Sequence, residues 1–371
     1  MKVQISNGMF MALIINMIYA KAIGVTQGSM AREVGGDIWI STLIATIQGG
    51  VIMFLVIFVI RRMPEGDLID QSARILGKWF GKFVALITFI FFLAAYGPVM
   101  STFVFHLKDY FLPEAPTLLF ILAAFLIGTY AIYFGVEVIA RMALIGVFSI
   151  IALNILLMLG SLSEFDIREL RPTFQMGFLR TVWASRHHNT DWAMATIMAG
   201  IILPMVANKE TWGKMGFAGI GYGMVFIIMW PILEAGVLSP ETAAQYIVSC
   251  MQMARSAQIG YFVHRYEMIM IAFFALSILT QIMMSLLCAS VAMQKILGLK
   301  DYRKVILPTA IILHAFGYWI NFDKNRAVDF LEGWWVYISI GVAVGLPFLI
   351  LVMGFFFKKK LKKEVVAEEA K

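Results

Sequence analysis

The stretch Tyr19-Ala20-Lys21-Ala22-Ile23-Gly24 puts a lysine deep inside the first long apolar segment of the chain. Lys21 lies about 15 residues, or roughly 22 Å of helix, from the start of that segment. A charge at this depth is costly unless it is paired or reaches the headgroups. Gly24 and Gly28 would allow the backbone to leave the helix here. Two alternatives stay equally open: an unwound segment facing a small ligand, or a helix that ends early with Lys21 snorkelling outward.

A second polar interruption, Ser185-Arg186-His187-His188-Asn189-Thr190-Asp191, lies within the sixth apolar segment. The apolar run after it, 192–206, is short for a bilayer core of roughly 30 Å. Thr190 and Asp191 could cap the following half-helix, whose N-terminus would attract a ligand carboxylate. We therefore predict helix over about 177–186, an irregular stretch within 187–191 and helix to about 206. An ordinary extracellular loop is the alternative.

Composition indicates that this protein resides in a lipid bilayer. Apolar residues make up 61% and charged residues 14% of the 371 residues, against about 25% charged in soluble domains. The net charge of +7 is expected to reflect loops at the membrane, not nucleic-acid binding. The two cysteines, Cys250 and Cys288, have no metal-type spacing. No phosphate-binding loop, nucleophile elbow or carboxylate pair is found, so we expect no enzyme, cofactor or metal site.

Long apolar segments joined by short loops predict an all-α polytopic membrane protein with about ten transmembrane helices. The predicted spans are 5–31, 38–60, 83–105, 117–134, 138–159, 175–206, 215–237, 267–296, 305–320 and 331–357. The stretches 67–82 and 239–260 are expected to form short helices at the membrane surface. Most lysines and arginines fall on the side of the termini, which predicts that both termini are cytoplasmic. The basic tail 358–371 could contact anionic lipid, although a stop-transfer role is the simpler interpretation.

Other polar side chains within the predicted spans are Tyr96, Asn154, Glu234, Gln281 and His314. Glu234 is the strongest functional candidate among them because it is ionisable. For Asn154 and His314 we expect hydrogen bonds between helices. Near the start of the eighth span, Arg265 and Glu267 are two positions apart and do not share a helix face. We expect each to pair with a neighbouring element in a structural role.

Short stretches over nearly the whole chain share their order and spacing with one family. They are Ala22-Ile-Gly24, Leu112-Pro-Glu-Ala-Pro116, Gly135-Val-Glu-Val-Ile-Ala-Arg141, Leu170-Arg-Pro172, Leu203-Pro204, Phe262-Val-His-Arg265-Tyr-Glu267 and Gly298-Leu-Lys-Asp-Tyr-Arg303. In them the chain resembles the B subunit of bacterial spore germinant receptors, within the amino acid–polyamine–organocation transporter superfamily. The family often carries a Phe-Gly-Glu type segment at the break in the sixth helix. Here His188-Asn-Thr-Asp-Trp-Ala193 stands instead, so the acid is either displaced to Asp191 or lost.

The resemblance implies a five-plus-five inverted repeat, 1–160 and 173–357, with broken first and sixth helices and the tail 358–371. It implies recognition of a small nutrient, expected to be an amino acid, and assembly with a receptor A subunit and a lipoprotein C subunit in the spore inner membrane. A secondary amino-acid permease acting on its own is the alternative. Lys21 and Glu234 are candidates for ion or proton coupling. Ligand contacts are expected from Ala20, Lys21, Gly24, Tyr96, His188, Asn189, Thr190, Asp191 and Gln281.

Overall fold

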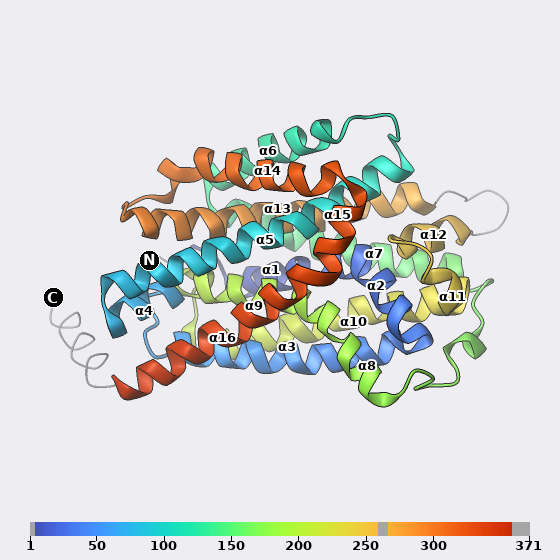
Figure 1. The fold of residues 1–371 in the computed structure, drawn as a ribbon, viewed down its shortest axis with the longest axis horizontal. Coiled ribbons are helices and arrows are strands. Elements are labelled where there is room, and N and C mark those ends of the chain that lie inside the picture. The colour runs from blue at the N-terminus through green and yellow to red at the C-terminus, as the bar shows by residue number, and fades with distance from the viewer. Residues whose placement is uncertain (1–3, 259–265, 358–371) are drawn as a thin grey trace.

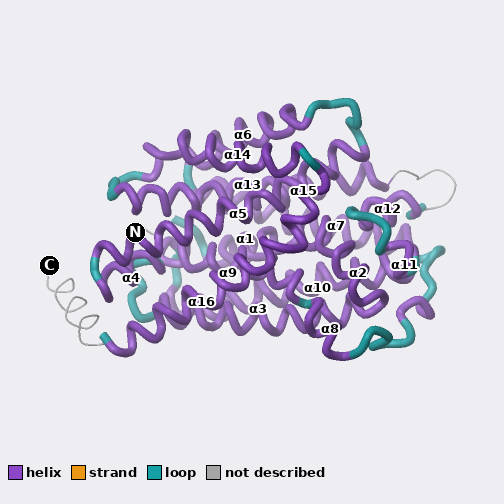
Figure 2. The backbone as a smooth tube through the Cα atoms, viewed as in Figure 1, coloured by secondary structure: helices purple, strands orange, loops and turns teal. Residues whose placement is uncertain are grey.

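The computed structural model describes residues 4–258 and 266–357 as a bundle of long helices with short connections (Figure 1). Helix covers nearly all of the described chain, as Figure 2 shows. The only strand-like pairing within these ranges is an isolated bridge between Ile5 and Val206. The predicted all-α class is therefore confirmed.

The first half of the chain contains an interrupted first helix, four further long helices and two short elements. Its elements are α1 (Asn7–Lys21), η1 (Ala22–Thr26), α2 (Gln27–Val34), η2 (Gly35–Asp37), α3 (Ile38–Ile60), α4 (Leu68–Leu76), α5 (Lys78–Tyr110), α6 (Thr117–Phe134) and α7 (Val136–Ser161). The predicted surface helix over 67–82 is shorter than expected. Gly77 (φ 95°) ends α4, and the remaining residues belong to α5.

Five long helices, α9, α10, α13, α14 and α16, and several short ones make up the described part of the second half. Its elements are η3 (Ile167–Leu170), α8 (Phe178–Ala184), α9 (Arg186–Ile202), η4 (Leu203–Met205), η5 (Lys209–Thr211), α10 (Trp212–Leu238), α11 (Pro240–Ala243), α12 (Ser249–Ser256), α13 (Tyr266–Leu297), η6 (Tyr302–Val305), α14 (Ile306–Phe322), α15 (Lys324–Asp329), η7 (Phe330–Trp334) and α16 (Trp335–Phe356). The expectation of one surface helix over 239–260 was wrong. Two short helices form there, and α12 buries Cys250, Met251 and Met253 because this apolar face packs against the bundle.

Eight helical stretches among the described residues are long and apolar enough to cross a bilayer. One of them, Asn7–Ile60, covers both the first and the second predicted span. The sixth predicted span is not among the eight; its helix is divided between α8 and α9, and α9 begins with the polar residues 186–191. The division into repeats 1–160 and 173–357 stays a prediction, and Arg265 and the tail 358–371 lie outside the described residues.

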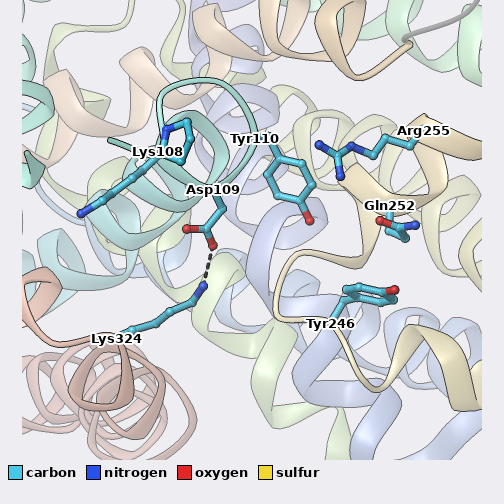
Figure 3. A pocket seen from close by; sticks show the side chains of 8 residues that line it. Lys108, Asp109, Tyr110, Tyr246, Gln252, Arg255 and Lys324 are labelled. Atoms are coloured by element: carbon cyan, nitrogen blue, oxygen red, sulfur yellow. Dashed lines mark hydrogen bonds and ion pairs between the residues drawn. The ribbon is translucent and has the colours of Figure 1, made fainter. Parts of the chain in front are cut away.

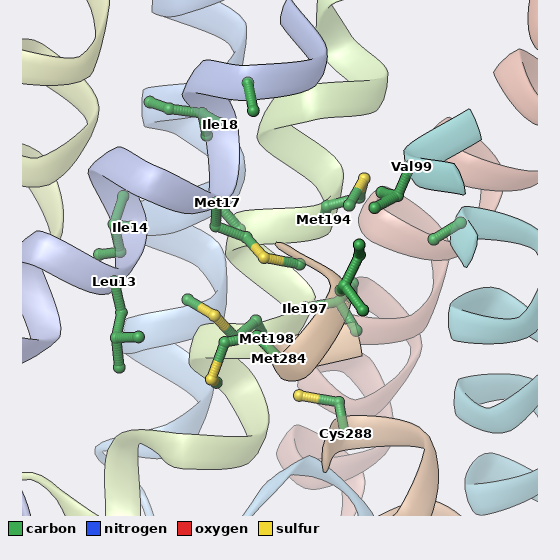
Figure 4. Packing of buried hydrophobic residues seen from close by; sticks show 14 of the residues in the cluster. Leu13, Ile14, Met17, Ile18, Val99, Met194, Ile197, Met198, Met284 and Cys288 are labelled. Carbon is green, nitrogen blue, oxygen red and sulfur yellow. The ribbon is translucent and has the colours of Figure 1, made fainter. Parts of the chain in front are cut away.

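Helix α1 lies inside the bundle, packed against α7, α9, α10 and α13. Its polar residues Asn16, Tyr19 and Lys21 would be costly to expose to lipid, and the bundle buries all three. Methionines fill much of the space around it: Met17, Met194, Met198 and Met284 come together in the interior (Figure 4). Their flexible, unbranched side chains suit irregular gaps between helices. This packing fixes α1, and with it Lys21, at the centre of the protein.

Hydrogen bonds between buried side chains also hold α1 in place. The Tyr19 hydroxyl donates to Asn154 Oδ1 at 2.6 Å, and the Trp230 indole N–H lies 3.0 Å from the Tyr19 oxygen and 3.2 Å from Asn154 Oδ1. Asn154 Nδ2 donates to the Phe226 carbonyl at 2.9 Å. The predicted interhelical role of Asn154 is thus confirmed. So is that of His314, whose Nε2 lies 2.7 Å from the Tyr96 hydroxyl.

Replacing Asn154 with alanine should lower the free energy of unfolding by about 1–3 kcal/mol, because the Tyr19 hydroxyl loses its buried acceptor. Unfolding of the purified protein in mixed SDS micelles would measure this. Thr129→Val is a matched control, since the bonds of the Thr129 hydroxyl among the described residues are to carbonyls of its own helix, Phe125 and Leu126. Equal losses in the two variants would contradict the network.

Candidate functional site

A buried ion pair joins the end of α1 to the beginning of α9. Lys21 Nζ lies 2.7 Å from Asp191 Oδ1, and the two side chains are 1% and 0% exposed. The same ammonium donates to Thr190 Oγ1 at 2.8 Å and to Thr26 Oγ1 at 3.0 Å. The ammonium therefore points into the protein, and the snorkelling alternative is excluded.

The second carboxylate oxygen of Asp191 extends the cluster to two more side chains. Asp191 Oδ2 accepts a bond from the Thr26 hydroxyl at 3.2 Å and lies 3.2 Å from His188 Nδ1. The other ring nitrogen of His188 lies 3.3 Å from Gln27 Nε2. All of these groups are buried. Opposite charges taken out of water need such pairing and additional hydrogen bonds to remain stable.

The first helix is not unwound at Lys21, which corrects one of the two expectations. Residues 22–26 continue as the π-helical turn η1, which inserts into the helix between α1 and α2. A π-turn keeps the backbone hydrogen-bonded, as a bilayer interior demands. Gly24 is closely covered by α5, since a Cβ there would lie 2.7 Å from Thr102 Cγ2 and 2.9 Å from His106 Cε1.

The sixth helix breaks at Ser185, not within 187–191 as predicted. Helix α8 ends at Ala184, and α9 begins at Arg186. The backbone N–H of Asn189 donates to the Ser185 carbonyl at 3.0 Å and closes the first turn of α9. Thr190 and Asp191 therefore lie in the second turn and cap nothing. Their side chains bond Lys21 of α1 and Thr26 of η1. The polar groups are thus satisfied while the backbone stays helical.

Two buried side-chain oxygens, one next to the His188 ring and one on the side of α9 that faces α3, have no hydrogen-bond partner among the described residues. They are Gln27 Oε1 and Asn189 Oδ1, both buried. The Asn189 amide nitrogen bonds Gln48 Oε1, which also accepts from the Ser185 hydroxyl at 3.0 Å. Buried polar groups are almost always satisfied by protein, water or ligand. These oxygens mark positions where a bound molecule could donate hydrogen bonds.

The other predicted site residues have different surroundings. Tyr96 pairs with His314 between α5 and α14. Gln281 of α13 donates to the Met17 carbonyl at 2.8 Å and so supports the helix before Lys21. Ala20 is buried in the core. Lys21, His188, Thr190 and Asp191 are brought together by the fold. The ligand contacts assigned to these four and to Asn189, Tyr96, Gln281, Gly24 and Ala20 all stay predictions.

Glu234 lies in a neighbouring buried cluster on the other side of η1. The Ser249 hydroxyl of α12 donates to one of its oxygens, and its other oxygen has no partner among the described residues. The adjacent Cys250 Sγ lies 3.6 Å from His106 Nε2 and 3.9 Å from the Gly24 carbonyl. Sequence reasoning missed His106, which lies just beyond the predicted third span. It also passed over Thr26 and Gln27, although both are polar residues within the first predicted span.

Charged side chains tie α2 to its neighbours beyond the cluster. Arg186 Nη1 donates to Glu33 Oε2 at 2.6 Å, and His187 Nε2 lies 3.0 Å from Glu33 Oε1. Arg32 pairs with Glu332 of η7. These contacts join α2 to α9 on one side and to the segment before α16 on the other, so α2 is held over the buried ion pair.

A family model described as "Spore germination protein" matches residues 4–325. This chain belongs to the spore germination protein family. Spore germination protein YndE of Bacillus subtilis (strain 168) is 24% identical over 94% of this chain and 95% of its own length. GerQB of Bacillus cereus is 26% identical over 87% of this chain and 88% of its own length. Spore germination protein KB of Bacillus subtilis (strain 168) is 21% identical over 100% and 99% of the two chains.

The fold of this spore germination protein is that of membrane transporters. MHP1, a nucleobase-cation-symport-1 family transporter in a closed conformation with bromovinylhydantoin bound, superposes with a TM-score of 0.71 at 10% identity, covering 93% of this chain and 78% of MHP1. MhsT in complex with L-phenylalanine gives a TM-score of 0.61 at 14% identity, covering 95% and 99%. The chain is an integral membrane protein of a germination family, and its relatives and structural neighbours are transporters or germination proteins rather than enzymes.

Proposed function

We propose that this spore germination protein is a membrane subunit of a germinant receptor and recognises a small nutrient, of the amino-acid class, at the Lys21–Asp191 cluster. The observation that carries the proposal is the buried ion pair, next to which Gln27 has an oxygen, Oε1, with no partner among the described residues. A zwitterionic amino acid has the same two charges. Its carboxylate would pair with Lys21 and its ammonium with Asp191, so both buried charges keep a partner when the ligand enters.

We infer the partners and the membrane from the family. The subunit would act with a receptor A subunit and a lipoprotein C subunit in the spore inner membrane, with both termini cytoplasmic. The spore germination proteins among its relatives support this assignment. Glu234 and Lys21 are our candidates for proton or ion coupling. The transporter fold supports the alternative of an amino-acid permease acting alone.

Thermal unfolding of the purified chain in lipid nanodiscs would test the ligand class. At least one amino acid should raise the midpoint, because a ligand that binds only the folded state stabilises it. The N-acetyl and methyl-ester derivatives of that amino acid, which each lack one charge, should not. Equal stabilisation by the derivatives, or by no amino acid at all, would contradict the proposal. Uptake of the radiolabelled amino acid into vesicles containing this chain alone would favour the permease.

A further inference from the structure

A cleft of about 420 Å³, seen close up in Figure 3, opens at the end of the bundle that carries α11 and α12 (Figure 1). Its volume falls within the range of about 300–1,000 Å³ that is usual for small-molecule sites. The end of α5, α12 with the loop before it, and the start of α15 form its walls. The lining residues are Lys108, Asp109, Tyr110, Pro113, Tyr246, Gln252, Arg255 and Lys324.

The charge of this cleft is unbalanced. It has three cationic side chains and one carboxylate, Asp109. Lys324 Nζ already pairs with Asp109 at 2.6 Å, and Lys108 Nζ donates to Thr117 Oγ1 at 3.1 Å. Arg255 pairs with no carboxylate of the described residues. Its guanidinium stands over the Tyr110 ring, 4.8 Å from the centroid.

The surroundings of Arg255 suit a planar anion. The Tyr110 hydroxyl donates to the Val248 carbonyl at 3.2 Å, which fixes the ring beneath the guanidinium. A guanidinium presents paired N–H donors that match the two oxygens of a carboxylate. Gln252, one turn before Arg255 on α12, and Tyr246 of the preceding loop lie below Arg255 in Figure 3 and offer an amide and a ring face to the rest of a ligand.

We propose that this cleft binds a small organic carboxylate, with Arg255 as the pairing cation and the rings of Tyr110 and Tyr246 beside the body of the ligand. The site is separate from the Lys21–Asp191 cluster and goes beyond the function proposed above. Helix α12 connects this cleft to the buried residues around Glu234. That helix carries Gln252 and Arg255 at the cleft, while its Ser249 and Cys250 contact Glu234 and the Gly24 carbonyl.

Calorimetric titration of the full chain in phosphatidylcholine nanodiscs with sodium benzoate tests the site. Benzylamine, which has the same ring with a cation, controls for partitioning into lipid. Benzoate should bind and benzylamine should not, and added salt should weaken benzoate binding because the cleft is exposed. Arg255→Gln should weaken benzoate binding about tenfold or more, as expected for loss of a hydrogen bond between charged groups.

Asp109→Asn gives a result that damage to the fold would not produce. It removes the one carboxylate among the described residues that line the cleft and frees Lys324, so benzoate binding should become tighter. Arg141→Gln is the matched control, because Arg141 is exposed and pairs with Glu137 of its own helix, outside the cleft lining. The Arg141→Gln protein should bind benzoate with the affinity of wild type. The proposal is overturned if Arg255→Gln binds benzoate as wild type does, if Asp109→Asn binds it more weakly, or if benzylamine binds equally well.

Discussion

Replacing Lys21 with methionine should lower the free energy of unfolding by about 3–5 kcal/mol, because it leaves the Asp191 carboxylate buried without its cation. The Asp191 side chain is 0% exposed. Of its remaining partners, Thr26 is neutral and His188 carries a charge only when it is protonated. Unfolding in mixed SDS micelles would give the value. Lys209→Met is a matched control. Its pair with Glu65 is exposed, so it should cost about 0–1 kcal/mol.

A double variant separates stability from recognition at the same site. Lys21→Met combined with Asp191→Asn removes both charges and should recover much of the lost stability, since no uncompensated charge is left. Neither the single nor the double variant should respond to amino acids, because the groups that pair with carboxylate and ammonium are gone. A Lys21→Met protein with the stability of wild type would contradict the buried pair. A double variant that still responds to amino acids would contradict the site.

Replacing Gly28 with alanine should cost about 1–3 kcal/mol, as expected for overpacking. A Cβ at this position would lie 2.4 Å from the Tyr246 carbonyl oxygen and 3.1 Å from that of Ile247. Both are backbone atoms, so α2 and the loop before α12 would have to move apart. Because α2 follows η1 directly, we also expect weaker amino-acid stabilisation in this variant. The same unfolding and thermal-shift measurements would show both effects.

Gly221→Ala is the control for the Gly28 prediction. Gly221 lies within α10, and a Cβ there would meet no atom within 4 Å. Alanine at this position should be neutral or should stabilise the helix by up to about 1 kcal/mol. A Gly28→Ala protein as stable as Gly221→Ala would show that α2 and the loop before α12 are not in close contact.

The sequence by itself determined the class of the protein and the course of its long helices. The bounds of α3 and α6 coincide with the predicted spans 38–60 and 117–134, because span length and hydropathy are local properties set by the bilayer. Sequence also singled out Lys21 and Asp191, since charged residues are rare and costly within membrane segments.

Only the tertiary structure decided how these residues are used. Lys21 and Asp191 pair across 170 positions, and no local pattern specifies such a partner. The same pairing explains why the backbone was mispredicted. With Thr190 and Asp191 bonded to Lys21 and Thr26, the sixth helix stays regular through 187–191, and the first needs only a π-turn. Gln281 and Tyr96, equally polar in sequence, hold neighbouring helices because the fold places a carbonyl and His314 within their reach.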